Sequence, residues 1–159
     1  MYPAADRGMG VRLPLLALMS EQNYPEPIVG ALILDEKGRV FLAKSPKWLG
    51  KYAIVGGHVE FGESLEGALK REVKEETNLD VSGPEFLGLQ EAIYSDAFSE
   101  KKHFIFFDYA CRAKEGEMIL NEEATDYLWV RPEEALLLPL NPFTLATVKR
   151  FIEKFPNGL

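Results

Sequence analysis

Apolar and polar positions follow two different periods along the chain, and turn-forming residues divide it into short segments. Runs rich in β-branched, aliphatic and aromatic residues predict strands. These runs cover residues 28–34, 39–43, 52–55, 86–94, 104–112 and 127–130. Helical spacing covers 65–77 after a capping Ser64, a further helix is expected from Pro132, and a last one over 144–155. Strands with one central helix and two final helices predict an α/β sandwich.

Two glycine-containing stretches are expected to interrupt these elements. The third strand is expected to end at Gly56 and Gly57, followed by a loop over 57–62, and residues 82–84, Ser-Gly-Pro, are expected to break the chain before the fourth strand. The chain has 159 residues, of which 47% are hydrophobic, which fits one globular domain. We therefore expect a single domain over 25–159 and a partly disordered N-terminal extension over 1–24.

Composition also indicates where in the cell the protein is expected. One cysteine, Cys111, allows no disulfide within the chain. The apolar stretch at 13–19 is far shorter than the roughly 18 residues of a membrane helix. The cytoplasm is the expected location, without a membrane partner.

The net charge of −7 argues against a broad basic face for a nucleic acid polymer. This charge is concentrated, because segments 57–79 and 113–126 together account for all of it. The two acidic segments could converge on a cation, and a cation would allow a small anionic ligand to bind there.

The helix at 65–77 places carboxylates where apolar residues belong. At about 100° per residue, Glu72 and Glu76 fall within its apolar stripe and Glu75 lies at the edge. A solvated charged face is the alternative interpretation. Burying clustered carboxylates costs several kcal/mol each unless their pKa values rise or a cation binds. Such a cluster suits Mg²⁺, with Mn²⁺ as a substitute.

The residues before this helix suggest an anion beside the cation. Gly56 and Gly57 allow close approach of the backbone to a ligand, and a helix N-terminus favours an anion. Trp48 could stack on a base and Lys51 could assist phosphate binding, although packed aromatics and solvated lysines are the alternatives. Together these features suggest phosphate chemistry.

The spacing of the polar residues resembles the signature of the Nudix hydrolases. Gly57, Glu63 after five residues and Arg71 with Glu72 after seven more begin a match that ends at Leu79. Every polar position of the 23-residue box agrees. Asn78 stands where the family has a final glycine, and Val55 where it commonly has a proline; neither departure removes an expected metal ligand.

The resemblance implies an α/β/α sandwich with a mixed central sheet. It implies that Glu72 and Glu76 are the main metal ligands, assisted by Glu75 and the carbonyl of Gly57. Arg71 would orient the carboxylates through Glu63.

The implied reaction is water attack at phosphorus in a nucleoside diphosphate linked to a further group. We favour hydrolysis of (d)NTPs to NMP and pyrophosphate. The alternatives are an ADP-ribose or nucleotide-sugar pyrophosphatase, and a non-catalytic module that senses a nucleotide. A monomer and a homodimer both remain open.

A later acidic segment offers one more ligand. Residues 120–127 resemble the corresponding stretch of GDP-mannose mannosyl hydrolases, in which a metal ligand lies four residues before the tyrosine. That position here is Glu123, an added ligand or base, although a solvated turn is the alternative. Ala124 stands where that subfamily has its catalytic histidine, which argues against attack at sugar carbon.

Overall fold

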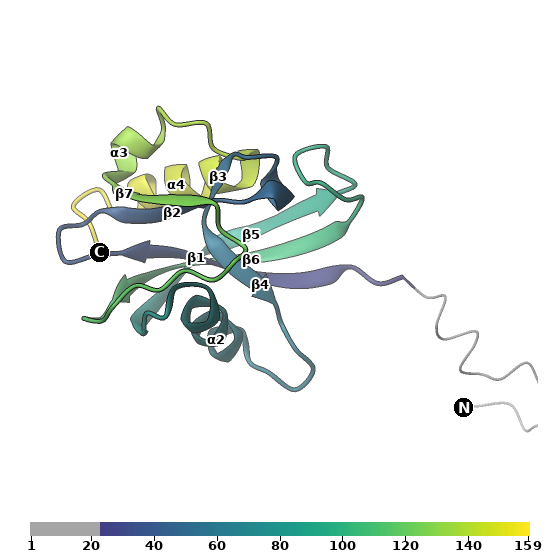
Figure 1. Ribbon diagram of the computed structural model, residues 1–159, viewed down its shortest axis with the longest axis horizontal. Coiled ribbons are helices and arrows are strands. Elements are labelled where there is room, and N and C mark those ends of the chain that lie inside the picture. Colours follow the sequence, from purple (N-terminus) through teal and green to yellow (C-terminus); the bar gives the residue numbers. More distant parts are fainter. Residues whose placement is uncertain (1–22) are drawn as a thin grey trace, which may run out of the picture.

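A computed structural model describes residues 23–159 (Figure 1). The expected extension therefore lies almost entirely outside the described residues. The strands are β1 (Glu26–Leu34), β2 (Val40–Lys44), β3 (Tyr52–Ala53), β4 (Val55–His58), β5 (Val81–Ile93), β6 (His103–Ala113) and β7 (Asp126–Val130). The helices are the 3-10 helix η1 (Pro46–Trp48) and the α-helices α2 (Leu65–Thr77), α3 (Pro132–Ala135) and α4 (Pro142–Lys154). No helix among residues 23–159 is long and apolar enough to cross a membrane.

The strands form one mixed sheet. Five of them lie in the order β3-β2-β1-β6-β5, while β4 pairs with β1 and β7 pairs with β2. The β1 and β6 strands are parallel, and the other pairs are antiparallel. β1 pairs with β2 at Leu34 and with β4 along 28–31, so β2 and β4 pair with different parts of β1. The predicted mixed α/β architecture is confirmed.

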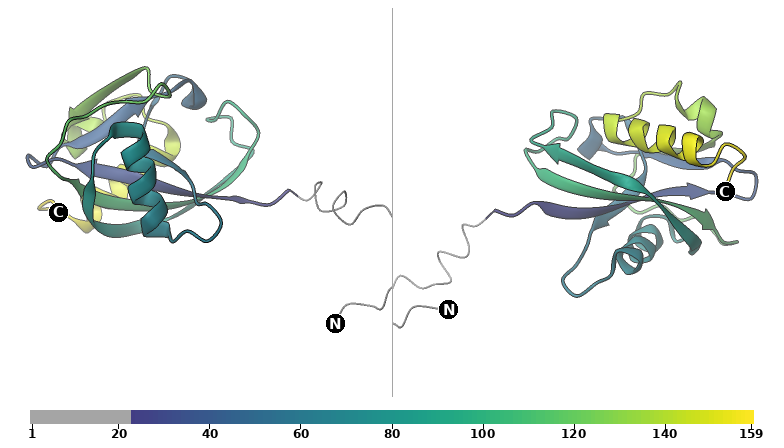
Figure 2. Two further views of the ribbon diagram at one scale, coloured as in Figure 1. Left: turned by 60° about the horizontal axis from the view of Figure 1, so that its bottom comes forward. Right: turned by 180° about the vertical axis from the view of Figure 1, so that it is seen from behind.

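Helices cover both faces of the sheet (Figures 1 and 2). α2 lies on one side, and α3 and α4 lie on the other. Successive side chains of a strand point to opposite faces, so β1 contributes to two cores. Val29, Ala31 and Ile33 belong to the core that contains the buried residues of α2. Leu32 and Leu34 belong to the core beside α4. Because both faces of β1 are buried, its sequence is a continuous apolar run.

The prediction that residues 82–84 interrupt the chain is wrong. β5 begins at Val81 and runs through Gly83 and Pro84, with register shifts between Ser82 and Glu85 and between Phe86 and Gly88. β5 is the last strand on its side of the sheet, where proline's missing N–H is tolerated, and the first irregularity accommodates Gly83 at φ +59°.

The prediction for the third strand also needs correction. Residues 52–58 form two strands, and Gly56 and Gly57 lie within β4 instead of ending the strand. Pairing with β1 continues through both glycines. This close pairing needs a glycine at position 56, because a Cβ there would lie 2.0 Å from the carbonyl oxygen of Val29. The last helix likewise begins earlier than 144, since the side chain of Asn141 accepts a hydrogen bond from Thr144 N at 2.8 Å.

Candidate active site

Helix α2 is fixed at both ends by local hydrogen bonds. The Ser64 hydroxyl accepts from Gly67 N at 3.0 Å, which caps the N-terminus as predicted. Asn78 ends the helix in the left-handed conformation, at φ 62°. The apolar stripe of α2, which includes Leu69 and Val73, is buried in the core. Its packing turns the carboxylates of the same helix face toward β4.

Arg71 connects α2 to the loop that precedes it. Its Nε and Nη2 donate to the two oxygens of Glu63 at 2.6 and 2.9 Å, and Nη2 also donates to the carbonyl of His58 at 3.0 Å. Its Nη1 donates to Glu72 at 2.8 Å and to Glu75 at 3.2 Å. The Arg71 hydrogen bonds lower the pKa of Glu63 to about 2. One guanidinium therefore organises three carboxylates, including the Glu63 contact that the resemblance implied.

Glu72 lies directly against the backbone of β4. Its side chain is 15% exposed, whereas that of Glu75 is 56% exposed, in agreement with their positions in and beside the apolar stripe. A Cβ on Gly57 would lie 2.3 Å from the Glu72 carboxyl carbon, so this glycine makes room for the carboxylate. Burial raises the pKa of Glu72, and the contact with Arg71 opposes that rise.

Glu76 is the most strongly perturbed carboxylate of the helix. Its Oε1 accepts a hydrogen bond from Gly56 N at 3.2 Å. Burial is the largest cause that raises its pKa to about 8, and the negative charges of Glu123 and Glu72 add to it. The positive charge of Lys47 opposes the rise. This local environment favours either a proton or a cation at Glu76.

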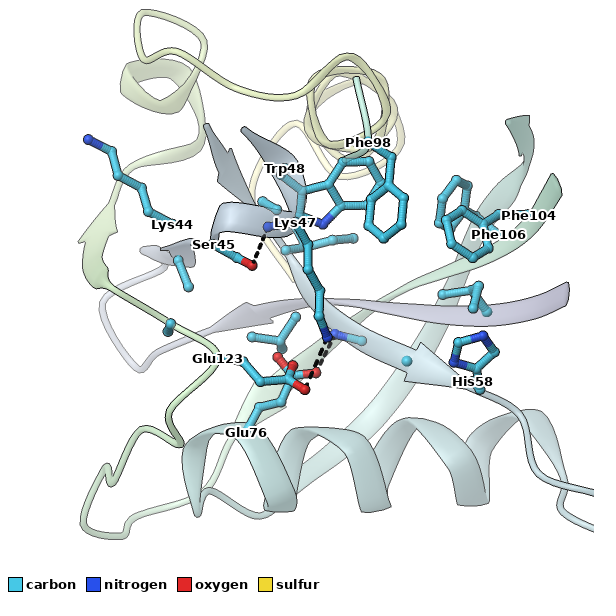
Figure 3. Close-up of a pocket in the computed structure, with 18 residues that line it drawn as sticks. Lys44, Ser45, Lys47, Trp48, His58, Glu76, Phe98, Phe104, Phe106 and Glu123 are labelled. Carbon is cyan, nitrogen blue, oxygen red and sulfur yellow. Dashed lines mark hydrogen bonds and ion pairs between the residues drawn. The ribbon is translucent and has the colours of Figure 1, made fainter. Parts of the chain in front are cut away.

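A cleft opens above Glu76, and we call it the central cleft. Figure 3 shows Glu76 and Glu123 facing each other at its floor, with the Lys47 ammonium group beside them. Lys47 Nζ lies 3.1 Å from Glu123 Oε1. Gly56 and Gly57 also line the cleft. The floor is thus acidic, and the glycine backbone and a lysine border it.

The opposite wall of the central cleft is aromatic. Trp48, Phe98, Phe104 and Phe106 line it (Figure 3). The Trp48 and Phe98 ring centroids are 4.9 Å apart and the rings meet edge to face. Trp48 is placed by η1, whose N-cap Ser45 accepts from Lys47 N at 3.2 Å. These rings give the cleft an apolar wall beside its acidic floor.

The acidic residues of the site have the chemistry of cation ligands but do not surround one point. Within residues 23–159, no three acidic, histidine or cysteine side chains converge closely enough to enclose a metal ion as they stand. The expected cluster is not assembled because Arg71 holds Glu72 and Glu75, and Lys47 pairs with Glu123. The donors are nevertheless carboxylates, the hard oxygen ligands that suit Mg²⁺, and the buried Glu76 has a raised pKa that a neighbouring cation would lower. The residue types therefore fit a divalent cation.

The structure brings together most of the residues that the sequence singled out. Gly56, Gly57, Glu76, Trp48 and Glu123 all line the central cleft. Glu72 lies against Gly57, and Glu63 and Glu75 contact Arg71.

Lys51 is the exception, since it is not among the described residues that line the cleft. Leu49 and Gly50 adopt left-handed conformations, at φ 55° and 75°, and turn the chain between Trp48 and Lys51. Lys47 occupies the floor instead.

Besides Lys47, two features in or beside the cleft were not among the predicted site residues. The first is the pair Phe104 and Phe106, whose period of two along a predicted strand places both on one face. The second is Asp108, the one acidic residue in the apolar run 104–111, which lines an adjoining hollow. A single charge inside a strand pattern was the available signal for it.

Comparisons with known proteins agree with this geometry. The NUDIX domain family matches residues 25–151. The nucleoside triphosphatase NudI of Salmonella arizonae is 35% identical over 106 residues, which cover 63% of this chain and 75% of the relative. Among solved structures, a MutT NUDIX hydrolase from Burkholderia pseudomallei has a TM-score of 0.69 at 25% identity, covering 80% of this chain and 98% of that one. The MutT protein of Methanosarcina mazei Go1 has a TM-score of 0.69 at 27% identity, covering 84% and 98%.

The family match spans most of the chain and includes all the residues placed in and around the central cleft. Nudix hydrolases generally use a divalent metal ion, which suits the acidic floor described above. This chain therefore belongs to the Nudix family and is a Nudix hydrolase.

Proposed function

We propose that this protein is a Mg²⁺-dependent hydrolase of nucleoside triphosphates that releases a nucleoside monophosphate and pyrophosphate. One observation carries the proposal: a single cleft joins the carboxylates of Glu76 and Glu123 to the aromatic wall formed around Trp48. An acidic floor with a cation suits a polyphosphate, and flat rings suit a base. The identity of about one third to NudI, a nucleoside triphosphatase, supports this substrate class.

The residues that would hold the cation are those of α2 and its surroundings. Glu72 and Glu76 are the main candidates, with Glu75, Glu123 and the Gly57 carbonyl assisting. A bound divalent cation supplies charge neutralisation at the phosphates and lowers the pKa of a bound water. Mn²⁺ has the same preference for oxygen ligands and is expected to substitute for Mg²⁺.

The protein's own groups then position the reactants. Arg71 fixes Glu72 and Glu63 relative to each other, which keeps the loop and the helix in one arrangement. Water would attack the α- or the β-phosphorus, the anhydride bond between these two phosphorus atoms would break, and the leaving group, pyrophosphate or NMP, would take the bonding electrons. The proton of the water would go to a carboxylate of α2 or to Glu123, which lines the cleft. Lys47 is placed to contact the substrate phosphates once its carboxylate partner binds a cation.

A substrate panel tests this proposal. Purified protein is incubated with (d)NTPs, ADP-ribose and nucleotide sugars, with Mg²⁺, with Mn²⁺ or with a chelator, and the products are separated by chromatography. We expect (d)NTP hydrolysis to NMP and pyrophosphate that the chelator abolishes. Glu72→Gln should lose most of this rate, whereas Glu66→Gln, an exposed control on the same helix, should keep it.

Three outcomes would contradict the proposal. Faster turnover of ADP-ribose or nucleotide sugars would replace the substrate class. Full activity in the chelator, or in Glu72→Gln, would remove the metal role. Tight nucleotide binding without turnover across the panel would instead favour a sensing module.

A further inference from the structure

A second, narrower hollow adjoins the central cleft between the sheet and α4, and we call it the inner hollow. It shares Ile28, Trp48, Gly56 and Phe106 with the central cleft, so the two spaces lie side by side. Its other residues include Phe143 from the first turn of α4. The inner hollow therefore extends the aromatic end of the cleft, where the proposed function places the base.

Asp108 supplies a charged group to this hollow. It lies on β6, is only 2% exposed, and lines the inner hollow. Its Oδ2 accepts hydrogen bonds from Gln90 Nε2 at 2.7 Å and from Thr147 Oγ1 at 2.8 Å. Gln90 Nε2 also lies 3.0 Å from Thr147 Oγ1 and 3.1 Å from the carbonyl of Phe143, so the group is tied to β5 and α4. The position of the carboxylate is therefore fixed.

The other oxygen of Asp108 has a different environment. Oδ1 lies over Gly30, where a Cβ would approach it to 2.4 Å, and it accepts no hydrogen bond from residues 23–159. Among the side-chain nitrogen and oxygen atoms of the described chain, His103 Nε2 is the one that is fully enclosed without a hydrogen-bond partner, so Oδ1 is not fully enclosed. A carboxylate that served only to join β5, β6 and α4 would not need an oxygen directed at a hollow. Burial also raises the pKa of Asp108, which shows that its setting is costly for a charge.

We propose that Asp108 Oδ1 accepts a hydrogen bond from the exocyclic amino group of the substrate's base, so that the site prefers amino bases over their keto counterparts. The ligand class rests on the proposed function. A keto oxygen at the same place would face the carboxylate as a second acceptor and would leave both groups without a donor. Two donors, from Gln90 and Thr147, already bond Oδ2 and lower the pKa of Asp108 against the larger effect of burial, so Oδ1 is the oxygen left to accept a hydrogen bond from a ligand. The rings of Trp48 and Phe106 would contact the faces of the base.

Two pairs of nucleoside monophosphates test this inference by binding. dCMP and dUMP differ in an amino or a keto group on the base, and so do dAMP and dIMP. Calorimetric titration of the wild-type protein in Mg²⁺ should give about tenfold tighter binding of each amino member. In Asp108→Asn, the amide oxygen is expected to remain toward Gln90, which turns the amide NH₂ toward the hollow. The preference should then disappear or reverse.

The matched control is Glu91→Gln, the same carboxylate-to-amide change at an exposed neighbour of Gln90 on β5. It should keep the wild-type ratio. Equal binding of both members of each pair by the wild type would overturn the inference. An Asp108→Asn protein that is less stable but keeps the wild-type binding ratio would also overturn the inference, because a purely structural carboxylate would give this result. Should Asp108→Asn fail to fold, the wild-type ratios decide.

Monophosphate binding separates this inference from the proposed function. If no triphosphate is hydrolysed but the amino preference holds and depends on Asp108, the proposed activity is wrong and the base contact stands. If triphosphates are hydrolysed without any such preference, the activity stands and the base contact is wrong.

Discussion

Replacing Glu76 by glutamine is expected to make the metal-free protein more stable and the enzyme much less active. The Glu76 carboxylate is buried near Glu72 and Glu123, and its pKa is raised to about 8 from 4.5. The folded state therefore holds this proton more tightly than the unfolded state does. The stabilisation that this bound proton gives the folded state is complete below pH 4.5 and is lost as the pH rises toward about 8.

The shift gives the expected magnitude. For a carboxyl group that stays protonated only in the folded state, raising the pH from 4.5 to 7 lowers the free energy of unfolding by about 3 kcal/mol. We expect Glu76→Gln to recover about 2 kcal/mol, because a buried amide keeps a desolvation cost of its own. For a domain of this size, this corresponds to a rise in Tm of about 6 °C at neutral pH. The rise should shrink as the pH falls toward 4.5 and vanish well below it, where wild-type Glu76 is protonated in both states.

The assay is thermal unfolding in chelator at several pH values, with Glu66→Gln as an exposed control on α2. Adding Mg²⁺ should raise the Tm of the wild type but not that of Glu76→Gln, since only a cation that binds the folded state stabilises it. Hydrolysis in Mg²⁺ should fall at least about 100-fold. A variant no more stable than the wild type at pH 8 would refute the burial reasoning. A full hydrolysis rate would refute the metal role.

The remaining predictions concern the residues around this carboxylate. Gly57→Ala should lower kcat/KM at least about tenfold with a small change in Tm, because the new methyl group displaces the flexible Glu72 side chain. Gly56→Ala should instead lower the Tm of the melting curve sharply, because its methyl group would meet the backbone of Val29. Arg71→Lys should reduce hydrolysis about tenfold, since an ammonium cannot reproduce the forked contacts of the guanidinium, and wild-type kcat would contradict this. Glu123→Gln should weaken Mg²⁺ binding about tenfold in a calorimetric titration, and an unchanged affinity would remove it from the ligand set.

Local sequence features predicted the position of α2 and the faces of its carboxylates. Ser64 and Asn78 have the chemistry of helix ends, and the helical period places Glu72 inside the apolar stripe and Glu75 at its edge. These relations span fewer than four turns of one helix, so they depend little on the rest of the chain. The conformation of the carboxylates was not predictable in this way, because it depends on Arg71 and Lys47 as competing partners.

The aromatic end of the cleft depends on contacts between distant parts of the chain. Trp48 follows β2, Phe98 lies in the loop between β5 and β6, and Phe143 begins α4. The parallel pairing of β1 with β6 brings these segments to one place, and no local period reports such pairing. The same pairing sets Asp108 opposite Gly30, so the role of that glycine becomes visible only in the folded chain.

The fold brings the two acidic segments of the chain together. The acidic segment 113–126 runs along the C-terminal end of α2, where Ile119 N donates to the carbonyl of Thr77 at 3.0 Å and Asn121 N donates to that of Glu76 at 3.2 Å. These bonds bring Glu123 to the acidic face of the helix, although 47 positions separate it from Glu76 in the numbering. Two segments of like charge repel each other, and Lys47 offsets only part of that repulsion. The fold thus places negative charge where a divalent cation would stabilise it most, and a polyphosphate bound through that cation would meet an attractive site in a protein of net charge −7.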